Sequence, residues 1–455
     1  MYRRTKIFAT IGPSSSSEGV LRRLLLYVNG VRINFSHGTE KEWRAWVKMI
    51  KRLENQHSLL ITYIGDLQGP SVRIGKIHAP VKLMPGTKIK LVLGYKPLSE
   101  GIPVPHEEFF DRVEVDDMIL ADDGRIRLRV VKQGRKEVLA EPLSGGKLSE
   151  GKALVIKDKE YRIEAPTEKD VRCIELVAKM DLDILAISYV READDVRKVR
   201  KVAEGYGFRG MILAKIEVPS AVKNLKEIVK EADYIMVARG DLGLHFGLEV
   251  VPQLQERIVD MTLSMGKPIM IATQILESMI YSNTPTRAEV NDIYTAVREG
   301  VDSLLLTGET AIGRYPVRAV KWLDRIVRTA DTNVKVHVIA LDVRDRFAEG
   351  IVTLAEDLGA RLIIYTMSGK TGFRIAKYRP GVSAFIGTPH EKVARMLNAL
   401  WGLKPLRIPA KTYAQGIQNT IEKALNEGLL NKGDIVIATY GLQATKKHFV
   451  ELLTL

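Results

Sequence analysis

Short apolar runs alternate with charge-rich, helix-like stretches along most of the 455 residues. Several of the charge-rich stretches open at Thr, Asp or Pro, as helices do, and examples are 40–54, 167–179, 194–204, 252–265 and 316–330. The apolar runs with the length of buried strands are 6–11, 31–35, 59–66, 184–190, 211–216, 234–238, 268–272 and 303–306. Alternating strands and helices are typical of a parallel sheet, and eight such units predict an α/β fold, a closed (β/α)8 TIM barrel.

Two segments depart from this rhythm. Between residues 70 and 165, short alternating runs with Gly-rich turns predict an inserted all-β domain, a β-barrel with strands at 88–93, 118–121, 125–131, 137–141 and 153–156. This insert leaves the barrel at the carboxyl end of a strand, so we expect it to act as a lid over an active site. After residue 331, strands at 362–366, 383–386 and 435–439 predict a separate α/β domain. The predicted domains are a catalytic barrel (1–69 and 166–330), a lid (70–165) and a C-terminal domain (331–455).

Composition excludes several classes of protein. Charged residues make up 27% of the chain, and no apolar run approaches the roughly 20 residues that a membrane span needs. Cys173 is the one cysteine, which excludes an internal disulfide and any multi-cysteine metal site. With no secretory signal at the start of the sequence, we expect a cytoplasmic protein.

The net charge of +14 indicates an anionic partner. Nucleic acid is disfavoured, because aromatic residues make up only 6% and no zinc-finger or RNA-binding motif is present. Anionic metabolites are the better explanation, and much of the excess charge belongs to the solvated surface.

Polar side chains gather at the carboxyl ends of the predicted barrel strands, where such barrels place their active sites. Arg32, Asn34 and Ser36 are spaced two apart, so a strand presents all three on one face. Other strands end at Asp66, at Lys215 and Glu217, at Arg239, Gly240 and Asp241, at Thr273, and at 307–310. Glu217 and Asp241 offer the oxygen ligands that Mg2+ prefers.

Eight stretches carry a resemblance to the pyruvate kinase family over essentially the whole chain. They are TIGP (10–13), RINFSHG (32–38), GDLQGP (65–70), KIE (215–217), MVARGDLG (236–243), ATQILESM (272–279), PTRAE (285–289) and GETA (308–311). The chain resembles archaeal and bacterial members without an N-terminal extension. The resemblance implies a barrel with a β lid, a C-terminal effector and interface domain, and a homotetramer. It also implies phosphoryl transfer from phosphoenolpyruvate to ADP, giving pyruvate and ATP in the final step of glycolysis.

Roles for individual residues are implied by the same resemblance. Lys215 matches the lysine that stabilises charge on the transferring phosphoryl group, and Arg32 would contact that phosphate. Glu217 and Asp241 match the ligands of Mg2+ or Mn2+. The residues that would hold the substrate carboxylate are Gly240, Asp241 and Thr273. Thr273 would also lie near the face where the enolate is protonated.

Nucleotide and monovalent-cation contacts are implied as well. The nucleotide-binding residues would be Arg73, His37 and Asn34, and the lid lysine that meets the ADP phosphates is either Lys147 or Lys152. The K+ site would consist of Asn34, Ser36, Asp66 and the carbonyl of Leu67, with Ser188 nearby.

Two departures from the family pattern concern K+. Ser71 stands where potassium-dependent members carry a glutamate, and Gln68 replaces a usual lysine. We therefore expect K+ to bind weakly or to be dispensable.

The C-terminal domain contains a turn that can bind phosphate. Its residues are Thr366, Ser368, Gly369, Lys370 and Thr371, which offer backbone amides, hydroxyls and one ammonium group. A nucleotide-binding P-loop is excluded, because Ile364 stands at the position of its first glycine. In the family this turn corresponds to the phosphate part of an allosteric sugar-phosphate site. The later effector loop, 440–448, is normally rich in glycine but has only Gly441 here, so we expect little or no response to fructose 1,6-bisphosphate.

Two alternatives stay open on the residues alone. One is a carbon–carbon lyase that uses a barrel, Mg2+ and a pyruvate enolate, since Glu217 and Asp241 would serve it equally well. The other is a non-catalytic metabolite sensor or nucleic-acid binder on the same scaffold, which the intact set of Lys215, Glu217, Asp241 and Thr273 disfavours.

Overall fold

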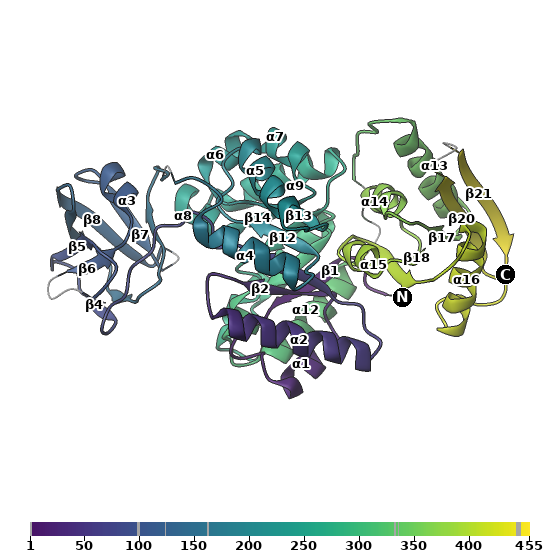
Figure 1. Cartoon of the computed structure of the whole chain (residues 1–455), viewed down its shortest axis with the longest axis horizontal. Helices are drawn as coiled ribbons and strands as arrows, with labels where there is room; N and C mark the ends of the chain where they lie inside the picture. The colour runs from purple at the N-terminus through teal and green to yellow at the C-terminus, as the bar shows by residue number, and fades with distance from the viewer. Residues whose placement is uncertain are drawn as a thin grey trace.

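A closed barrel of eight parallel strands forms the centre of the molecule (Figure 1). The computed structural model describes residues 2–97, 101–122, 124–161, 163–331, 334, 336–442 and 447–455. The order around the barrel is β1-β16-β15-β14-β13-β12-β3-β2. The strands are β1 (Lys6–Thr10), β2 (Gly30–Asn34), β3 (Thr62–Asp66), β12 (Ile184–Ile187), β13 (Met211–Ile216), β14 (Tyr234–Ala238), β15 (Ile269–Ala272) and β16 (Ser303–Leu306). The (β/α)8 prediction is confirmed.

The barrel strands read as continuous apolar runs because both of their faces are covered. Phe8, Leu213 and Leu305 belong to one buried cluster that continues into the C-terminal domain. Their strand neighbours Ile7 and Ile212 belong to a second cluster, which includes the surrounding helices. Neighbouring residues of one strand therefore pack into two different layers of the core.

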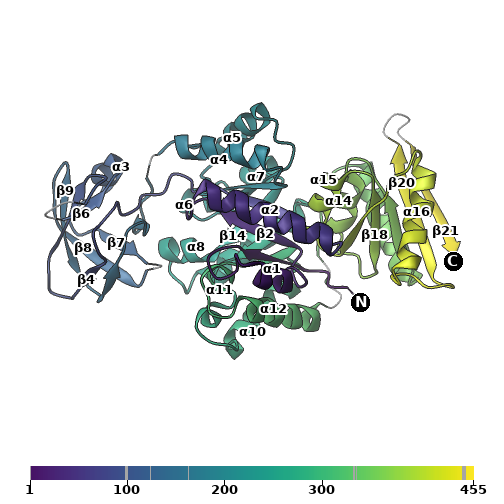
Figure 2. The same cartoon turned by 60° about the horizontal axis from the view of Figure 1, so that its bottom comes forward.

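Helices surround the barrel, and Figure 2 shows α2, α4 and α12 on its outside. The helices are α1 (Glu18–Leu24), α2 (Glu40–Gln56), α4 (Glu168–Lys179), α5 (Ala193–Gly205), α6 (Pro219–Lys223), α7 (Leu225–Glu231), α8 (Arg239–Phe246), α9 (Val251–Ser264), η1 (Glu277–Ile280), α10 (Arg287–Arg298), α11 (Gly308–Ala311) and α12 (Pro316–Ala330). Capping boxes at Thr39, Thr167 and Thr286 begin α2, α4 and α10. None of the helices in the described part of the chain is long and apolar enough to cross a lipid bilayer.

The insert between β3 and β12 consists mainly of strands. They are β4 (Val81–Leu83), β5 (Ile89–Leu93), β6 (Ile102–Val104), β7 (Met118–Ala121), β8 (Ile126–Gln133), β9 (Glu137–Pro142), β10 (Gly146–Leu148) and β11 (Leu154–Ile156). Their pairing differs from the predicted β-barrel: β4 pairs with β10, and the other six form a sheet in the order β11-β7-β8-β9-β5-β6. The insert also contains one short helix, α3 (Glu107–Arg112), which buries Phe109 and Phe110 and has two glutamates in its first turn.

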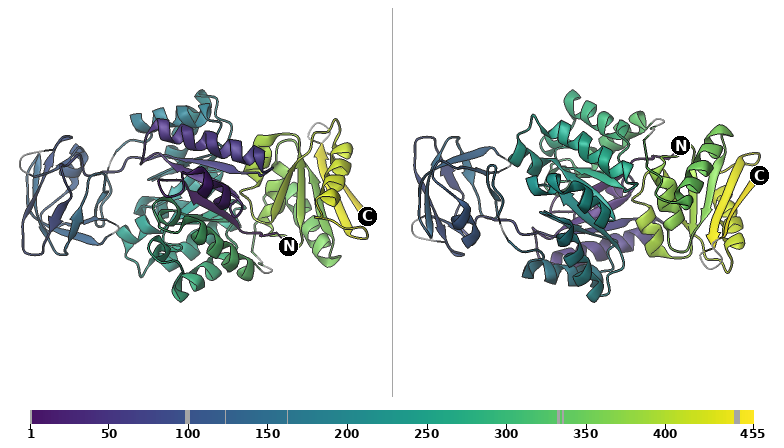
Figure 3. Two further views of the ribbon diagram at one scale, coloured as in Figure 1. Left: turned by 90° about the horizontal axis from the view of Figure 1, so that it is seen from below. Right: turned by 90° about the horizontal axis from the view of Figure 1, so that it is seen from above.

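The insert lies at one end of the barrel and the C-terminal domain at the other, as both views in Figure 3 show. Leu120 and Val155 of the insert pack with Leu244 of α8, which directly follows β14. Arg125 of the insert forms an ion pair with Glu277, at 2.5 Å, beyond the end of β15. The insert thus contacts the barrel at the carboxyl ends of the strands.

The C-terminal domain is a five-stranded sheet in the order β19-β18-β17-β20-β21 with helices packed on it. Its elements are α13 (Val343–Asp357), β17 (Arg361–Tyr365), α14 (Lys370–Lys377), β18 (Ala384–Thr388), α15 (Glu391–Leu397), β19 (Leu403–Arg407), α16 (Tyr413–Asn426), β20 (Ile435–Leu442) and β21 (Lys447–Thr454). The strands β19 and β21 were not predicted. Between β20 and β21, residues 443–446 of the predicted effector loop lie outside the described residues.

Candidate active site

A cavity of about 380 Å3 lies between the carboxyl ends of the barrel strands and the insert. The predicted site residues that line it are Arg32, Asn34, Ser36, His37, Arg73, Lys215, Glu217, Asp241 and Thr273. Three other predicted site residues do not line the cavity themselves but contact residues that do. Gly240 contacts it through Thr273, Asp66 through Arg32, and the Leu67 carbonyl through Ser188.

Lys215, at the end of β13, is a buried cation among carboxylates. Its Nζ lies 2.6 Å from Glu217 Oε1 and 3.7 Å from Asp66 Oδ2, and it donates to Ser188 Oγ at 2.7 Å. Burial alone lowers the pKa of Lys215, but Asp66 and Glu217 outweigh it and leave the pKa above its ordinary value. The side chain therefore keeps its positive charge at neutral pH.

Arg32, in β2, supplies a second cation to the same cavity. Its Nε donates to Asp66 Oδ2 at 2.6 Å, and its Nη1 donates to Thr10 Oγ1 at 3.2 Å. These contacts orient the guanidinium plane, whose forked donors match a phosphate.

Glu217 and Asp241 fit a divalent metal ion by the chemistry of their donors. Glu217 Oε2 accepts from the Tyr189 backbone N–H at 2.7 Å, and the buried Oε1 forms an ion pair with the Lys215 ammonium at 2.6 Å. Within the described ranges, no group of three or more His, Cys, Asp or Glu side chains could hold a metal. Two carboxylates at an open cavity suit an ion such as Mg2+ that keeps positions for water and substrate.

Thr273, just after β15, is held in an unusual backbone conformation. Its φ is +69° and that of Gln274 is +52°, a left-handed region that a β-branched residue enters only at a cost of about 1–3 kcal/mol. The Gly240 N–H donates to Thr273 Oγ1 at 2.7 Å. The hydroxyl is thereby fixed at the wall of the cavity.

Of the oxygens predicted to bind K+, those of Asn34, Asp66 and Leu67 are already engaged within the protein. Asn34 Oδ1 accepts from the Ser36 N–H at 3.0 Å, and the Leu67 carbonyl accepts from Ser188 Oγ at 2.9 Å. Asp66 is 0% exposed and is paired with Arg32. Arg32 and Lys215 thus neutralise the charge of the Asp66 carboxylate.

The two departures from the family pattern have local partners. Ser71 Oγ accepts from Arg73 Nε at 2.9 Å, so this serine helps to orient a predicted nucleotide contact. Gln68 Oε1 accepts from Lys169 Nζ at 2.5 Å. A lysine from α4 therefore stands beside the position where the family carries a lysine of its own.

The structure separates the two candidate lid lysines. Lys152 lines the cavity and pairs with Asp122 at 2.5 Å. Lys147 lies in β10 opposite Lys82 and is exposed, away from the cavity. Tyr189 and Glu150 also line the cavity without having been predicted, since neither ends a predicted barrel strand.

The predicted phosphate turn of the C-terminal domain lines a smaller cavity of about 90 Å3. Thr366, Ser368, Lys370 and Thr371 contribute to it, and the Gly369 N–H donates to Thr366 Oγ1 at 3.0 Å. Sequence reasoning missed Arg344 and Arg374, which bring two further cations from α13 and α14.

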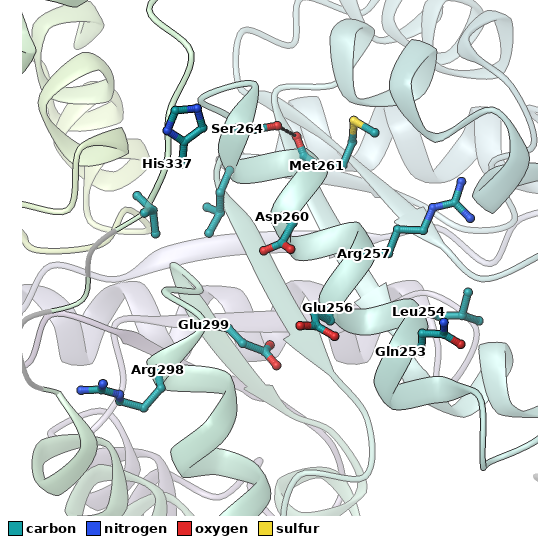
Figure 4. A pocket seen from close by; sticks show the side chains of 12 residues that line it. Gln253, Leu254, Glu256, Arg257, Asp260, Met261, Ser264, Arg298, Glu299 and His337 are labelled. Atoms are coloured by element: carbon teal, nitrogen blue, oxygen red, sulfur yellow. Dashed lines mark hydrogen bonds between the residues drawn. The ribbon is translucent and has the colours of Figure 1, made fainter.

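A groove of about 980 Å3, larger than the cavity at the strand ends, lies on the outer surface of α9 and the end of α10 (Figure 4). Its lining includes Glu256, Asp260, Glu299 and His337. It contains none of the predicted site residues. We therefore place the candidate active site in the smaller cavity at the strand ends, where the predicted residues meet.

Two family models match the chain. The model described as pyruvate kinase, barrel domain, matches residues 2–320. The model described as pyruvate kinase, alpha/beta domain, matches residues 345–454. These matches favour a kinase over the lyase and sensor alternatives.

Known proteins are similar over almost the full length of the chain. The pyruvate kinase of Pyrobaculum aerophilum is 42% identical over 443 residues, covering 96% of this chain and 94% of that protein. The pyruvate kinase of Aeropyrum pernix is 37% identical over 438 residues, with coverages of 95% and 94%. The crystal structure of the Pyrobaculum enzyme superimposes with a TM-score of 0.88 over 99% of both chains, at 41% identity. That of a pyruvate kinase from Cryptosporidium parvum gives a TM-score of 0.90 at 29% identity, over 99% of this chain and 96% of that one. The chain therefore belongs to the pyruvate kinase family and is a phosphotransferase.

Proposed function

We propose that the chain transfers a phosphoryl group from phosphoenolpyruvate to ADP, giving pyruvate and ATP, with Mg2+ or Mn2+ as cofactor. The observation that carries this proposal is the meeting of Lys215, Arg32 and a pair of carboxylates in one cavity that the insert partly walls. Phosphoryl transfer asks the protein mainly to align donor with acceptor and to stabilise charge.

Each cavity residue has a role in this reaction. Lys215 and Arg32 stabilise the charge on the phosphoryl group as its bond to the enol oxygen breaks and a bond to an ADP oxygen forms. Gly240, Asp241 and Thr273 orient the substrate carboxylate, and the Thr273 hydroxyl lies beside the carbon that takes a proton. Glu217 and Asp241 would hold a divalent ion, which would supply positive charge that favours the enolate.

ADP is expected to approach from the side of the insert. Arg73 Nη1 donates to the Gly151 carbonyl at 2.8 Å, which ties this arginine to the segment that carries Lys152. We assign the ADP phosphates to Arg73 and Lys152, with His37 and Asn34 at the same rim. Lys147 has no part in this assignment.

The proposal is tested by adding phosphoenolpyruvate, ADP and Mg2+ to the purified protein and coupling pyruvate to lactate dehydrogenase. We expect NADH oxidation that requires all three additions, and ATP formed in equal amount. Absence of phosphoryl transfer, with cleavage of a carbon–carbon bond in a 2-oxo acid instead, would establish the lyase.

Omission of K+ should leave most of the turnover intact. Arg32 and Lys215 already compensate the charge of Asp66, and Ser71 provides no carboxylate for a further cation. The measurement is kcat in a tetramethylammonium buffer with and without added KCl. A rate that collapses without K+ and returns on its addition would contradict this expectation.

A phosphate-type anion is expected to bind at Ser368–Thr371, where Lys370, Arg344 and Arg374 line the small cavity. That cavity is small compared with the several hundred Å3 of most ligand pockets. We therefore expect weak or no activation by fructose 1,6-bisphosphate in initial-rate kinetics, and loss of phosphate binding in Lys370→Ala by calorimetry. Strong activation by the bisphosphate would overturn the first part, and unchanged phosphate binding in Lys370→Ala the second.

Several expectations stay predictions. They are the homotetramer, the cytoplasmic location, the place in glycolysis, and the domain boundaries at 69/70, 165/166 and 330/331.

A further inference from the structure

Arg239 begins α8 immediately after β14, yet its side chain turns away from the substrate cavity. It is 5% exposed and is not among the residues that line the cavity. Its Nε and Nη2 donate to the Thr273 carbonyl at 3.2 and 3.0 Å, and Nη2 also donates to the Gln274 carbonyl at 2.6 Å. One edge of the guanidinium thus holds two successive carbonyls of the loop after β15.

The opposite edge of the same guanidinium is anchored to two helices. Nη1 donates to both carboxylate oxygens of Asp292 in α10, each at 2.8 Å, and to Gln255 Oε1 in α9 at 3.5 Å. Gln255 in turn donates to Glu299 Oε2 at 2.9 Å, and Glu299 lines the outer groove of Figure 4. Asp292 and Gln255 therefore hold one edge of the guanidinium from outside the cavity, while the other edge contacts the loop after β15.

The two carbonyls that Arg239 holds belong to the two left-handed residues, Thr273 and Gln274. Such residues persist only where the surroundings define them strongly. The residue after Arg239 also contacts this loop, because the Gly240 N–H donates to Thr273 Oγ1 at 2.7 Å. Backbone carbonyl and side-chain hydroxyl of Thr273 are thus bound by neighbouring residues of one segment.

We propose that Arg239, anchored by Asp292, is a positioning residue that sets the place of the Thr273 hydroxyl in the cavity and acts on the reaction only through it. This inference rests on the proposed function of Thr273 at the substrate carboxylate and at the carbon that is protonated. A lysine does not replace Arg239, because an ammonium group cannot span both carbonyls and the carboxylate in one plane.

The test compares Arg239→Lys and Asp292→Asn with the unaltered protein in two assays. One is turnover of phosphoenolpyruvate and ADP, and the other is exchange of the pyruvate methyl hydrogens with D2O, followed by NMR. Because a misplaced group costs up to about 100-fold, we expect both rates to fall by about 10- to 100-fold in Arg239→Lys. A smaller fall is expected in Asp292→Asn, and the KM for ADP should stay unchanged in both. Unchanged rates in both variants, with an active parent protein, would overturn the proposal.

A matched control is Arg200→Lys. Arg200 likewise bridges a carboxylate and a backbone carbonyl, Asp233 Oδ2 and the Glu231 carbonyl, each at 2.9 Å, far from the cavity. We expect both rates of this control to match the parent. A loss equal to that of Arg239→Lys would mean that any broken arginine bridge lowers activity, which would count against a positioning role.

The decisive measurement is a double-mutant cycle with Thr273→Ala. If Arg239 acts through Thr273, then adding Arg239→Lys or Asp292→Asn to Thr273→Ala should change kcat by no more than about twofold. Losses that multiply would show that Arg239 acts elsewhere and would overturn the inference. Should Arg239→Lys fail to fold, the isosteric Asp292→Asn carries the cycle alone. Failure of the proposed function is recognised separately, because the parent protein would then form no pyruvate from phosphoenolpyruvate and ADP.

Discussion

Replacement of Lys215 by methionine should lower kcat by about 100- to 1,000-fold or more, since one lost charge-stabilising group costs about 3–4 kcal/mol. Methionine has a similar length and no charge, so the cavity keeps its shape. The raised pKa of Lys215 means that the side chain is charged throughout the neutral range, because Asp66 and Glu217 outweigh the effect of burial. The loss should therefore appear at every pH from 6 to 9, not only at one end of the profile.

Two measurements separate this catalytic role from damage to the fold. Binding of Mn2+, followed by its effect on water proton relaxation, should survive in Lys215→Met because both carboxylates remain. Lys267→Met is the matched control: Lys267 Nζ donates to the Ala232 carbonyl at 2.6 Å, next to the start of β14 and far from the cavity. We expect normal kcat for the control. Near-normal kcat for Lys215→Met would remove Lys215 from its role.

The barrel could be predicted because its strands are buried on both faces and therefore appear in the sequence as continuous apolar runs. The bounds of β13, β14, β16 and α12 agree with the predicted ranges, whereas the run 184–190 ends as a strand at Ile187. Apolar content continues past that point, but Tyr189 takes a left-handed conformation with φ +56°. Hydrophobicity marks what is buried and does not mark where a strand stops.

The missed strands of the C-terminal domain lack an uninterrupted apolar run of strand length. β19 carries Pro405 and two basic residues, and β21 is exposed along most of its length. β21 pairs antiparallel with β20 at the edge of the sheet, and side chains on both of its faces are exposed. Strands of this kind are defined by pairing with a neighbouring strand, not by their own burial.

The site could be predicted as far as it depends on strand ends. Lys215, Glu217 and Thr273 meet because parallel strands bring their carboxyl ends together. The choice between Lys147 and Lys152 depended on the fold of the insert, which no local pattern encodes. Arg239 was predicted only as a strand-end charge, since the direction of its side chain is decided by Asp292, 53 residues later.

Replacement of Glu217 by glutamine should weaken divalent-metal binding and lower kcat together. The substitution removes one of two carboxylate charges at the predicted metal site, and a catalytic metal supplies several kcal/mol of charge stabilisation, so a loss of about 100-fold or more in kcat is expected. The amide oxygen can still accept from the Tyr189 N–H, so the local backbone keeps its hydrogen bond. Mn2+ affinity is measured by titration in the absence of substrates, which gives a readout that does not depend on turnover.

The matched control for Glu217→Gln is Glu54→Gln, a buried glutamate with a similar set of partners. Glu54 Oε1 accepts from the Ile61 N–H at 2.9 Å, Oε2 accepts from Tyr63 Oη at 2.7 Å, and Arg395 lies 3.4 Å away. It lies far from the cavity, so its loss should alter thermal stability without altering Mn2+ affinity. If Glu217→Gln bound Mn2+ as tightly as the parent, the metal would not be held by Glu217. If both variants lost affinity equally, the effect would come from the fold, and the assignment of the metal to Glu217 and Asp241 would be wrong.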